Sequence, residues 1–135
     1  MELKEVIKKR KSIRVFKEKE VPDLTKLIAL AKTGPSAGGI RGFEVIATKE
    51  KVISLDAPLY LVICTNPEAY AKRYGDRGRN LYSIQDATIC GAYLQLLLVE
   101  MGLASVWIGA FRERRVAKAL GTNLRPIAVI AVGYA

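Results

Sequence analysis

The segment from Ser83 to Met101 constrains the fold of this chain more than any other, because its spacing predicts one long helix that is apolar nearly all round. One predicted face carries Ile84, Ala87, Cys90, Tyr93, Leu94, Leu97 and Met101, and the rest of the circumference carries Ile89, Ala92, Leu96 and Val99. Such a helix must be covered on nearly all sides. In a chain of only 135 residues, we expect part of that cover to come from a second copy.

Short sequence patterns also mark the two ends of this helix. Ser83 and Asp86 have the spacing of a capping box, so the helix is expected to begin at Ser83, and Gly102 is expected to end it. Upstream, Asn66 and Pro67 open either a short helix or a loop to about residue 76. The stretch 73–80 is polar and contains glycine, which allows a mobile loop.

The remaining segments alternate between strand and helix patterns. Near-continuous apolar runs at 59–65 and 127–133 predict buried strands, and shorter strands are predicted at 43–48 and 105–109. Helices are predicted at 2–9, at 24–33 with Asp23 as N-cap, and at 112–120, and residues 12–16 are predicted to be extended. This order fits an α+β or α/β sandwich with a mostly buried sheet, formed by a single domain over residues 1–135.

The residue types that are missing limit the chemistry. The chain has no histidine and two cysteines, Cys64 and Cys90, which are far apart in the sequence. These counts exclude a Ser-His-Asp triad, a Cys-His pair, a histidine-ligated metal, a disulfide framework and any multi-cysteine metal site. No metal site is predicted, so the chemistry must come from carboxylates, cations, hydroxyls, backbone dipoles or a borrowed cofactor.

Positive charge is in excess, since 22 Lys and Arg face 13 Asp and Glu for a formal net charge of +9. The excess favours an anionic partner, such as nucleic acid, a phosphate-bearing cofactor or a membrane surface, although a solubilising surface has the same composition. Three clusters hold many of the cations: eight within the first twenty positions, then Lys72, Arg73, Arg77 and Arg79, then Arg112, Arg114 and Arg115. No signal peptide or membrane span is evident, so a cytoplasmic protein without a membrane partner is expected.

Several segments together resemble one known family. Residues 9–16 read Lys-Arg-Lys-Ser-Ile-Arg-Val-Phe, residues 31–39 read Ala-Lys-Thr-Gly-Pro-Ser-Ala-Gly-Gly, and residues 102–111 read Gly-Leu-Ala-Ser-Val-Trp-Ile-Gly-Ala-Phe. Residues 56–58 (Asp-Ala-Pro) and 127–135 (Ile-Ala-Val-Ile-Ala-Val-Gly-Tyr-Ala) add two more. In order and spacing, these five segments resemble the signatures of the nitroreductase family of flavin enzymes.

The resemblance implies an α+β nitroreductase-like sandwich, in which helices flank a mixed, mostly antiparallel central sheet. It also implies a homodimer with FMN at the interface, touching both subunits. The flavin of such enzymes takes a hydride from NADH or NADPH and passes electrons to nitroaromatics, quinones or similar small-molecule acceptors. Because the flavin carries the redox chemistry, no catalytic acid or base is assigned to the chain.

The resemblance also assigns cofactor-binding residues, and each group has a plain structural alternative. Cations and a serine at 10–14 suit phosphate and ribityl oxygens, or a solvated basic helix end. The loop 35–39 suits the flavin ring, or a helix stop and tight turn. The strand end 108–110 suits an approach to flavin N5, or a core strand that needs a small residue. The assigned residues are Arg10, Lys11, Ser12, Arg14, Pro35, Ser36, Ala37, Gly38, Gly39, Ile108, Gly109 and Ala110.

Two further readings stay open. In the loop, Gly38 or Gly39 stands where the family usually has asparagine, and this Ser-Ala-Gly-Gly version resembles the subgroup that oxidises azoline rings in peptide-modifying systems. The clustered cations allow a second function, that of a flavin-free family member that binds nucleic acid or another polyanion. Nucleic acid is not the expected partner, because no helix-turn-helix spacing, RRM signature or zinc finger is recognisable and aromatic residues do not interleave with the cations.

Overall fold

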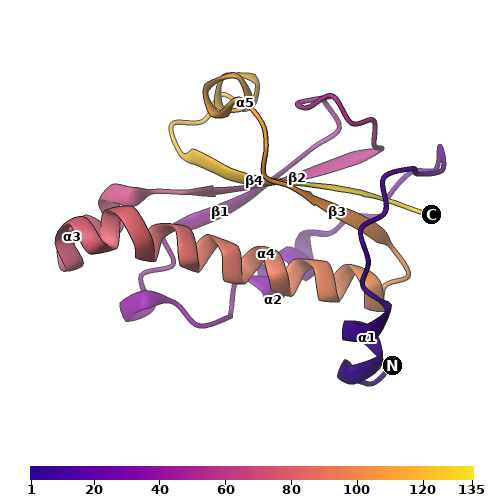
Figure 1. The fold of residues 1–135 in the computed structure, drawn as a ribbon, viewed down its shortest axis with the longest axis horizontal. Coiled ribbons are helices and arrows are strands. Elements are labelled where there is room, and N and C mark those ends of the chain that lie inside the picture. The colour runs from indigo at the N-terminus through magenta and orange to yellow at the C-terminus, as the bar shows by residue number, and fades with distance from the viewer.

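The computed structural model describes residues 1–135 and is built on one four-stranded sheet (Figure 1). The strands are β1 (Phe43–Thr48), β2 (Leu59–Thr65), β3 (Ala104–Ile108) and β4 (Arg125–Gly133), in the order β1-β2-β4-β3. All neighbouring pairs are antiparallel, and one parallel bridge joins Ser12 to Ser105 on the free edge of β3. The α+β class with a mixed, mostly antiparallel sheet is therefore confirmed.

The two apolar runs form the centre of this sheet. All seven residues of β2 are buried, and β4 is buried from Ala128 to Gly133. A strand covered on both faces needs apolar side chains at nearly every position, which is why the pattern located it. The predicted strands 59–65 and 43–48 coincide with β2 and β1, and the predictions for β3 and β4 differ only at the strand ends.

Helices lie on both faces of the sheet (Figure 1). On one face lies α4 (Ser83–Glu100), with α1 (Leu3–Lys9) and α2 (Thr25–Ala31) against it, and on the other lies α5 (Glu113–Leu120). The connection 49–58 also covers the α5 face, where Val52 is buried. Because side chains alternate along a strand, β2 supplies Leu61 to the α4-side core and Val62 to the α5-side core.

The long helix begins differently from its prediction, and the capping box at Ser83 and Asp86 is wrong. No side chain caps α4, because the chain arrives already helical and its backbone continues the hydrogen bonding. Ser83 Oγ donates to the Arg79 carbonyl at 2.7 Å, one turn upstream. The Asp86 carboxylate is turned away from the helix and is therefore available to other segments.

The prediction that residues 73–80 could form a mobile loop is also wrong, since this stretch is helical. There α3 (Pro67–Arg77) passes into η2 (Gly78–Tyr82), a π-helical turn that leads into α4. Gly75 kinks α3 with φ 61° and ψ −142°, and a Cβ on Gly78 would lie 2.5 Å from the Tyr70 carbonyl oxygen. These glycines therefore serve a kink and a close backbone contact within a helical segment.

The first half of the chain follows its predictions with small shifts. The helix predicted at 24–33 is α2, which is shorter, and its N-cap residue is Leu24. Asp23 lies one position earlier, and its carboxylate accepts hydrogen bonds from the hydroxyl and the N–H of Thr25. Those two hydrogen bonds lower the pKa of Asp23. None of the helices combines the length and the apolar character that a membrane crossing requires.

We expect both cysteines to be inert in the folded protein. Cys64 and Cys90 are 0% and 1% exposed, and burial raises the pKa of each thiol to about 11. A raised thiol pKa keeps the neutral form below that pH, so only ~0.1% is thiolate at pH 8. Titration with a disulfide reagent at pH 8 should give negligible reaction when the protein is folded and two thiols in denaturant. Reaction of the folded protein at the rate of free cysteine would contradict this burial.

Candidate functional site

The loop between α2 and β1 is held by one buried carboxylate, Asp86, from the first turns of α4. Asp86 is 3% exposed and accepts a hydrogen bond from Ser36 Oγ at 2.5 Å. The backbone N–H of Ala37 donates to both of its oxygens, at 3.1 and 3.2 Å. A charge removed from water needs such donors. Asp86 therefore fixes the predicted flavin loop to the start of α4.

A third donor to Asp86 comes from α3. The hydroxyl of Tyr70, which is fully buried, donates to Asp86 at 2.8 Å and accepts from the N–H of Gly42 at 3.0 Å. Burial, together with the neighbouring Asp86 carboxylate, strongly raises the pKa of Tyr70, so its hydroxyl stays protonated and remains a donor. The network joins the loop, α3 and α4 and leaves no buried side-chain polar atom without a partner.

Left-handed backbone lets the loop turn sharply after Ala37. Gly38 and Gly39 have φ values of 57° and 66°, which glycine adopts without strain. Arg41, at φ 47°, adopts this region without being glycine. Its side chain donates from Nε to the Lys32 carbonyl and from Nη2 to the Gly34 carbonyl, each at 3.2 Å. These bonds to the end of α2 offset the backbone strain at Arg41.

A shallow cavity of 560 Å³, called here the loop cavity, lies beside this loop. Residues 35–37 form one side, and Tyr82, Ile84 and Ile89 are among the residues that line the rest. Most of the wall surface is apolar, and its polar residues include Ser36, the buried Asp86, Gln85 and Thr88. The apolar wall beside a polar backbone segment suits one face and one edge of a flat heterocycle.

The cations predicted to hold a phosphate lie in a different place. Arg10, Lys11 and Arg14 are all exposed, and no carboxylate pairs with any of them. Their backbone is held at the edge of the sheet, since the N–H of Ile13 donates to the Ser105 carbonyl at 3.0 Å. Unpaired guanidinium groups on an anchored segment are free to bind an anion.

Within one chain, these cations and the loop do not meet. The cations follow α1, near the C-terminal end of α4, whereas the loop is bound at the N-terminal end of α4 (Figure 1). A helix of 18 residues is about 27 Å long, so α4 separates the two groups by most of that length. One subunit therefore brings together Pro35–Gly39 with Asp86, and it leaves Arg10, Lys11, Ser12 and Arg14 apart from them.

The third predicted group, Ile108–Ala110, lies at the end of β3, where the chain turns toward α5. Gly109 and Ala110 are exposed, and a Cβ on Gly109 would meet nothing nearer than the Trp107 Nε1 at 4.0 Å. Packing within this chain therefore does not require the glycine, and the alternative of a crowded core strand is not supported. A cavity of 320 Å³ adjoins this strand end and is lined by Phe111, Arg112 and Arg115 among others.

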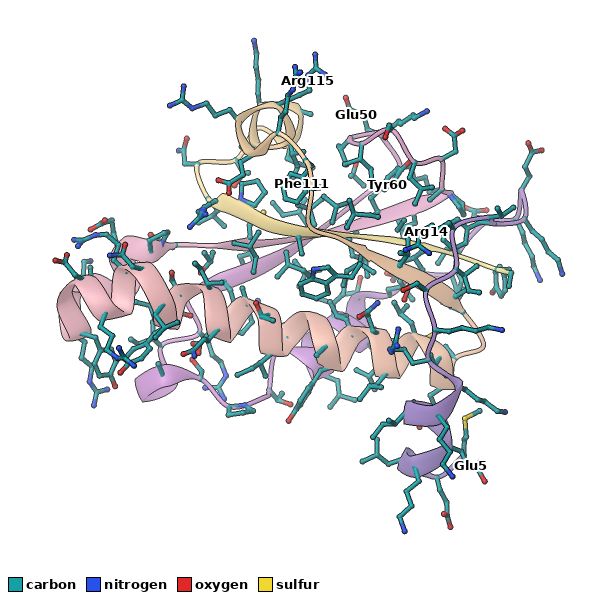
Figure 2. The ribbon with its side chains drawn as sticks, viewed as in Figure 1. Glu5, Arg14, Glu50, Tyr60, Phe111 and Arg115 are labelled. Carbon is teal, nitrogen blue, oxygen red and sulfur yellow. The ribbon has the colours of Figure 1, made fainter.

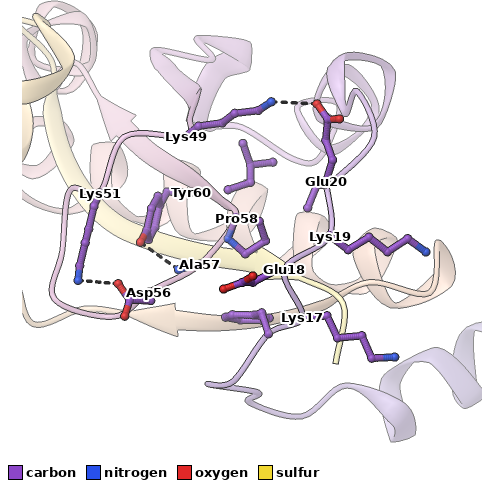
Figure 3. A pocket seen from close by; sticks show the side chains of 13 residues that line it. Lys17, Glu18, Lys19, Glu20, Lys49, Lys51, Asp56, Ala57, Pro58 and Tyr60 are labelled. Carbon is purple, nitrogen blue, oxygen red and sulfur yellow. Dashed lines mark hydrogen bonds and ion pairs between the residues drawn. The ribbon is translucent and has the colours of Figure 1, made fainter.

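A third cavity, of 570 Å³, contains none of the predicted site residues (Figure 3). It lies between residues 16–21 and the connection 49–60, above Pro58 and Tyr60. Two of its four lysines are paired, since Lys49 contacts Glu20 at 3.0 Å and Lys51 contacts Asp56 at 2.6 Å. Figure 3 shows that the Lys49–Glu20 pair joins the two segments, whereas the Lys51–Asp56 pair lies within the connection.

Sequence reasoning missed Asp86 and Tyr70 as parts of the site. Asp86 was assigned to the helix end, and Tyr70 stood in a segment with no clear pattern. One signal was present, because Asp86 is the one acidic residue of the predicted helix before Glu100 and lies one turn before Cys90 on the predicted apolar face. A carboxylate within a buried helix needs donors, and a loop with a serine and free N–H groups can supply them.

Comparison with known proteins agrees with this architecture. The Nitroreductase family profile matches residues 48–134. A protein of Methanothermobacter thermautotrophicus, named as a candidate NADH dehydrogenase/NAD(P)H nitroreductase, is 28% identical over 99% of this chain and 78% of its own. A nitroreductase family protein from Clostridium novyi has a TM-score of 0.86 at 28% identity, over 99% of this chain and 85% of its own.

A third protein has a cofactor in its name. The FMN-dependent nitroreductase from Clostridium difficile matches with a TM-score of 0.77 and 26% identity, over 96% of this chain and 86% of its own. The sequence match and the fold therefore agree with each other and with the five segments that carried the resemblance. This chain belongs to the nitroreductase family.

Proposed function

We propose that this protein is a homodimeric, FMN-dependent oxidoreductase that uses NADH or NADPH to reduce small-molecule acceptors such as nitroaromatics or quinones. The observation that carries the proposal is that one chain contains two separate groups of residues, called here half-sites, each of which provides only part of an FMN site. Arg10 and Arg14 are unpaired cations without a ring site, and the loop cavity is a ring site without phosphate-binding cations. Two copies related by a two-fold axis can complete both.

The exposed apolar side chains support such a pairing. The large apolar side chains that face solvent come from α1, α2, α4 with its C-cap and the N-terminal segment: Met1, Leu3, Ile7, Val15, Leu30, Tyr93 and Met101. None comes from the sheet or from α3 or α5. Leu3 and Val15 are 65% and 82% exposed. Exposed apolar residues that gather on one part of a surface are typical of an interface. Burying this set would supply the cover that the apolar α4 requires.

The residues present fit FMN. Arg10 and Arg14, with Lys11 and Ser12, would hold the phosphate, because guanidinium groups bind phosphate oxygens in pairs. The loop Pro35–Gly39 would lie against the ring of the flavin bound to the cations of the other copy. The open space at Gly109 admits a ligand next to the backbone of Ile108–Ala110. These groups bind and orient, and bound FMN would supply the hydride acceptance and electron transfer.

Some groups of the loop are already occupied and cannot also bind a cofactor. The N–H of Ala37 is used by Asp86, and the N–H groups of Gly39 and Ile40 donate to Ser36 and Ala37 carbonyls. The Ser36 hydroxyl donates to Asp86 and accepts from the N–H of Arg41 at 2.9 Å. We infer that Asp86 sets the shape of the loop, and that the N–H of Ser36 and the Pro35 ring face the flavin.

The alternative of a polyanion-binding protein has less support. Its cations would need to form one stripe, but the three clusters lie on different sides of the molecule, after α1, along α3 and on α5 (Figure 1). One of these cations, Arg79, is also paired with Glu68 and Asp76. A polyanion that crosses many phosphates needs a continuous track of cations.

Removing the N-terminal guanidinium groups should weaken FMN binding. Arg10→Gln and Arg14→Gln are each expected to raise the Kd for FMN about tenfold or more, because a charge-assisted hydrogen bond contributes about 1.5–3 kcal/mol. The quenching of FMN fluorescence on titration measures the Kd. Lys26→Gln, which removes an exposed charge from α2, is the matched control and should leave the Kd unchanged. Equal effects of all three variants would contradict the phosphate assignment.

Removing the Asp86 carboxylate should loosen the loop and weaken the fold. Asp86→Ala leaves the donors on Ser36, Ala37 and Tyr70 without an acceptor, which should lower the free energy of unfolding by about 2–4 kcal/mol. Chemical denaturation measures this change. Asp86→Asn keeps one acceptor oxygen, so it should lose less stability and still show weaker FMN binding. An unfolding energy unchanged by Asp86→Ala would mean that the network contributes nothing.

A mixed dimer tests whether the site is shared between subunits. One subunit carries Arg10→Gln and Arg14→Gln, and the other carries Gly38→Val, which strains the loop at φ 57°. Each variant alone should bind little FMN, whereas the heterodimer, purified with two different tags, should regain about half of the wild-type FMN because one of its two sites is intact. A heterodimer without FMN would place the whole site within one subunit.

A further inference from the structure

The second cluster of cations, on α3 and η2, divides into two parts with different environments. Arg79 is neutralised, since it pairs with Glu68 at 2.7 Å and also with Asp76. The hydrogen bond from Arg79 lowers the pKa of Glu68, which agrees with a stable pair. Arg73 and Arg77 have no carboxylate partner. The charge of these two residues is therefore available to a ligand.

Two tyrosines organise the free arginines. The rings of Tyr74 and Tyr82 meet edge to face, with centroids 5.1 Å apart and planes at 81°. Arg73 lies over Tyr74 at 5.2 Å from the ring centroid, and Arg77 lies over Tyr82 at 5.6 Å. Arg77 Nε also donates to the Tyr82 hydroxyl at 3.2 Å. Cation–π contact and the hydrogen bond hold the guanidinium groups beside the rings, so they are more ordered than solvated arginines.

This group, the Tyr–Arg cluster of Arg73, Tyr74, Arg77 and Tyr82, lies against the loop. Arg73 Nη1 donates to the Gly38 carbonyl at 3.3 Å, and a Cβ on Gly38 would lie 2.8 Å from the Tyr74 hydroxyl. Tyr82 is also one of the residues that line the loop cavity with Pro35 and Ala37. The cluster therefore borders the place where the proposed function puts the flavin ring.

We propose that the Tyr–Arg cluster binds the electron acceptor and that it selects planar aromatic acceptors carrying a carboxylate or another anionic group. This proposal rests on the proposed function. The tyrosine rings offer an apolar edge to a flat molecule, and the unpaired guanidinium donors bind an anion at its rim. The only carboxylate in the loop cavity, Asp86, has its oxygens turned to Ser36, Ala37 and Tyr70, so its hydrogen-bonding positions are already taken.

The flavin phosphate is a weaker candidate for these arginines. The tail of FMN carries one phosphate, and Arg10 and Arg14 provide unpaired cations for it at the far end of α4. The Tyr–Arg cluster instead adjoins the loop assigned to the flavin ring. In that place FMN offers the polar edge of its ring and not its phosphate. The two assignments differ in a measurable way, because loss of a phosphate contact weakens FMN binding and loss of an acceptor contact does not.

A matched pair of nitro compounds tests the proposal. 4-Nitrobenzoate and 4-nitrobenzamide have nearly the same shape and differ by one charge. For each, NAD(P)H gives two electrons and a proton, solvent gives a second proton, and the nitro group becomes nitroso with release of water. Equilibrium dialysis against FMN-loaded protein measures the binding of each compound, and NAD(P)H consumption measures kcat/KM.

The wild-type protein should bind the benzoate about tenfold more tightly than the benzamide, and 0.5 M salt should remove most of this difference because it screens exposed charges. The variant Arg77→Gln, which leaves the Arg73–Gly38 contact in place, should weaken benzoate binding about three- to tenfold while benzamide binding and the Kd for FMN stay within about twofold. Arg114→Gln, an exposed arginine of α5, is the control and should change neither. The ratio of the two kcat/KM values should change in parallel with binding.

Three results would overturn the proposal. Equal binding of the two compounds by the wild type would remove the charge selection, and an equal loss for both in Arg77→Gln would show a structural effect. A weaker Kd for FMN in Arg77→Gln would assign this arginine to the cofactor. Failure of the wild type to bind FMN or to reduce even the benzamide would instead refute the proposed function, and the acceptor site with it.

Discussion

The hydrogen bonds to Asp86 determine the geometry of one whole end of this molecule. This carboxylate joins three segments that are far apart in the sequence. The residue itself belongs to α4, the loop before β1 donates to it through Ser36 and Ala37, and α3 donates through Tyr70. A charge this deeply buried is stable only if its donors stay in place. The loop is therefore fixed by α4, and its glycines can turn sharply without making the loop disordered.

The length of α4 is a second constraint, because this helix separates the two half-sites of the proposed function. The cations after α1 and the loop lie near opposite ends of this helix (Figure 1). In the proposed function, one copy alone can hold the phosphate of FMN or face its ring but not both, because the two half-sites lie near opposite ends of α4. The same helix exposes Tyr93, and α1 and α2, which pack against it, expose further apolar residues. The proposed function therefore needs a second copy in the opposite direction, and the apolar surface supports such a pairing.

The sequence located what burial determines and missed what distant contacts determine. The strands at 43–48 and 59–65 were placed to the residue. For 59–65 the cause is cover on both faces, which leaves a continuous apolar run in the chain itself. The spacing of Ser83 and Asp86 fits a capping box, but it fits equally well a carboxylate that accepts hydrogen bonds from distant segments. The donors that settle the role of Asp86 are Ser36 and Tyr70, which lie 50 and 16 residues away in the sequence. Gly78 gives the same kind of error, because the Tyr70 carbonyl that demands it is not a neighbour that a loop signal can identify.

The net charge predicted even less about function, because the value of +9 sums cations that lie in very different environments. Arg79 and Arg125 are paired with carboxylates, and Arg41 binds carbonyls at the end of α2, so these are structural. Arg10, Arg14, Arg73 and Arg77 are among the arginines without a carboxylate. The first two stand beside Ser12 in the sequence, and the last two lie on tyrosine rings. A hydroxyl beside a guanidinium suits a phosphate ester, whereas a ring beside it suits an aromatic anion. Figure 2 shows Arg115 on α5, above one face of the sheet, and Arg14 on the segment beside the edge of β3. Free cations in this fold are therefore best assigned from their immediate neighbours and not from their total charge.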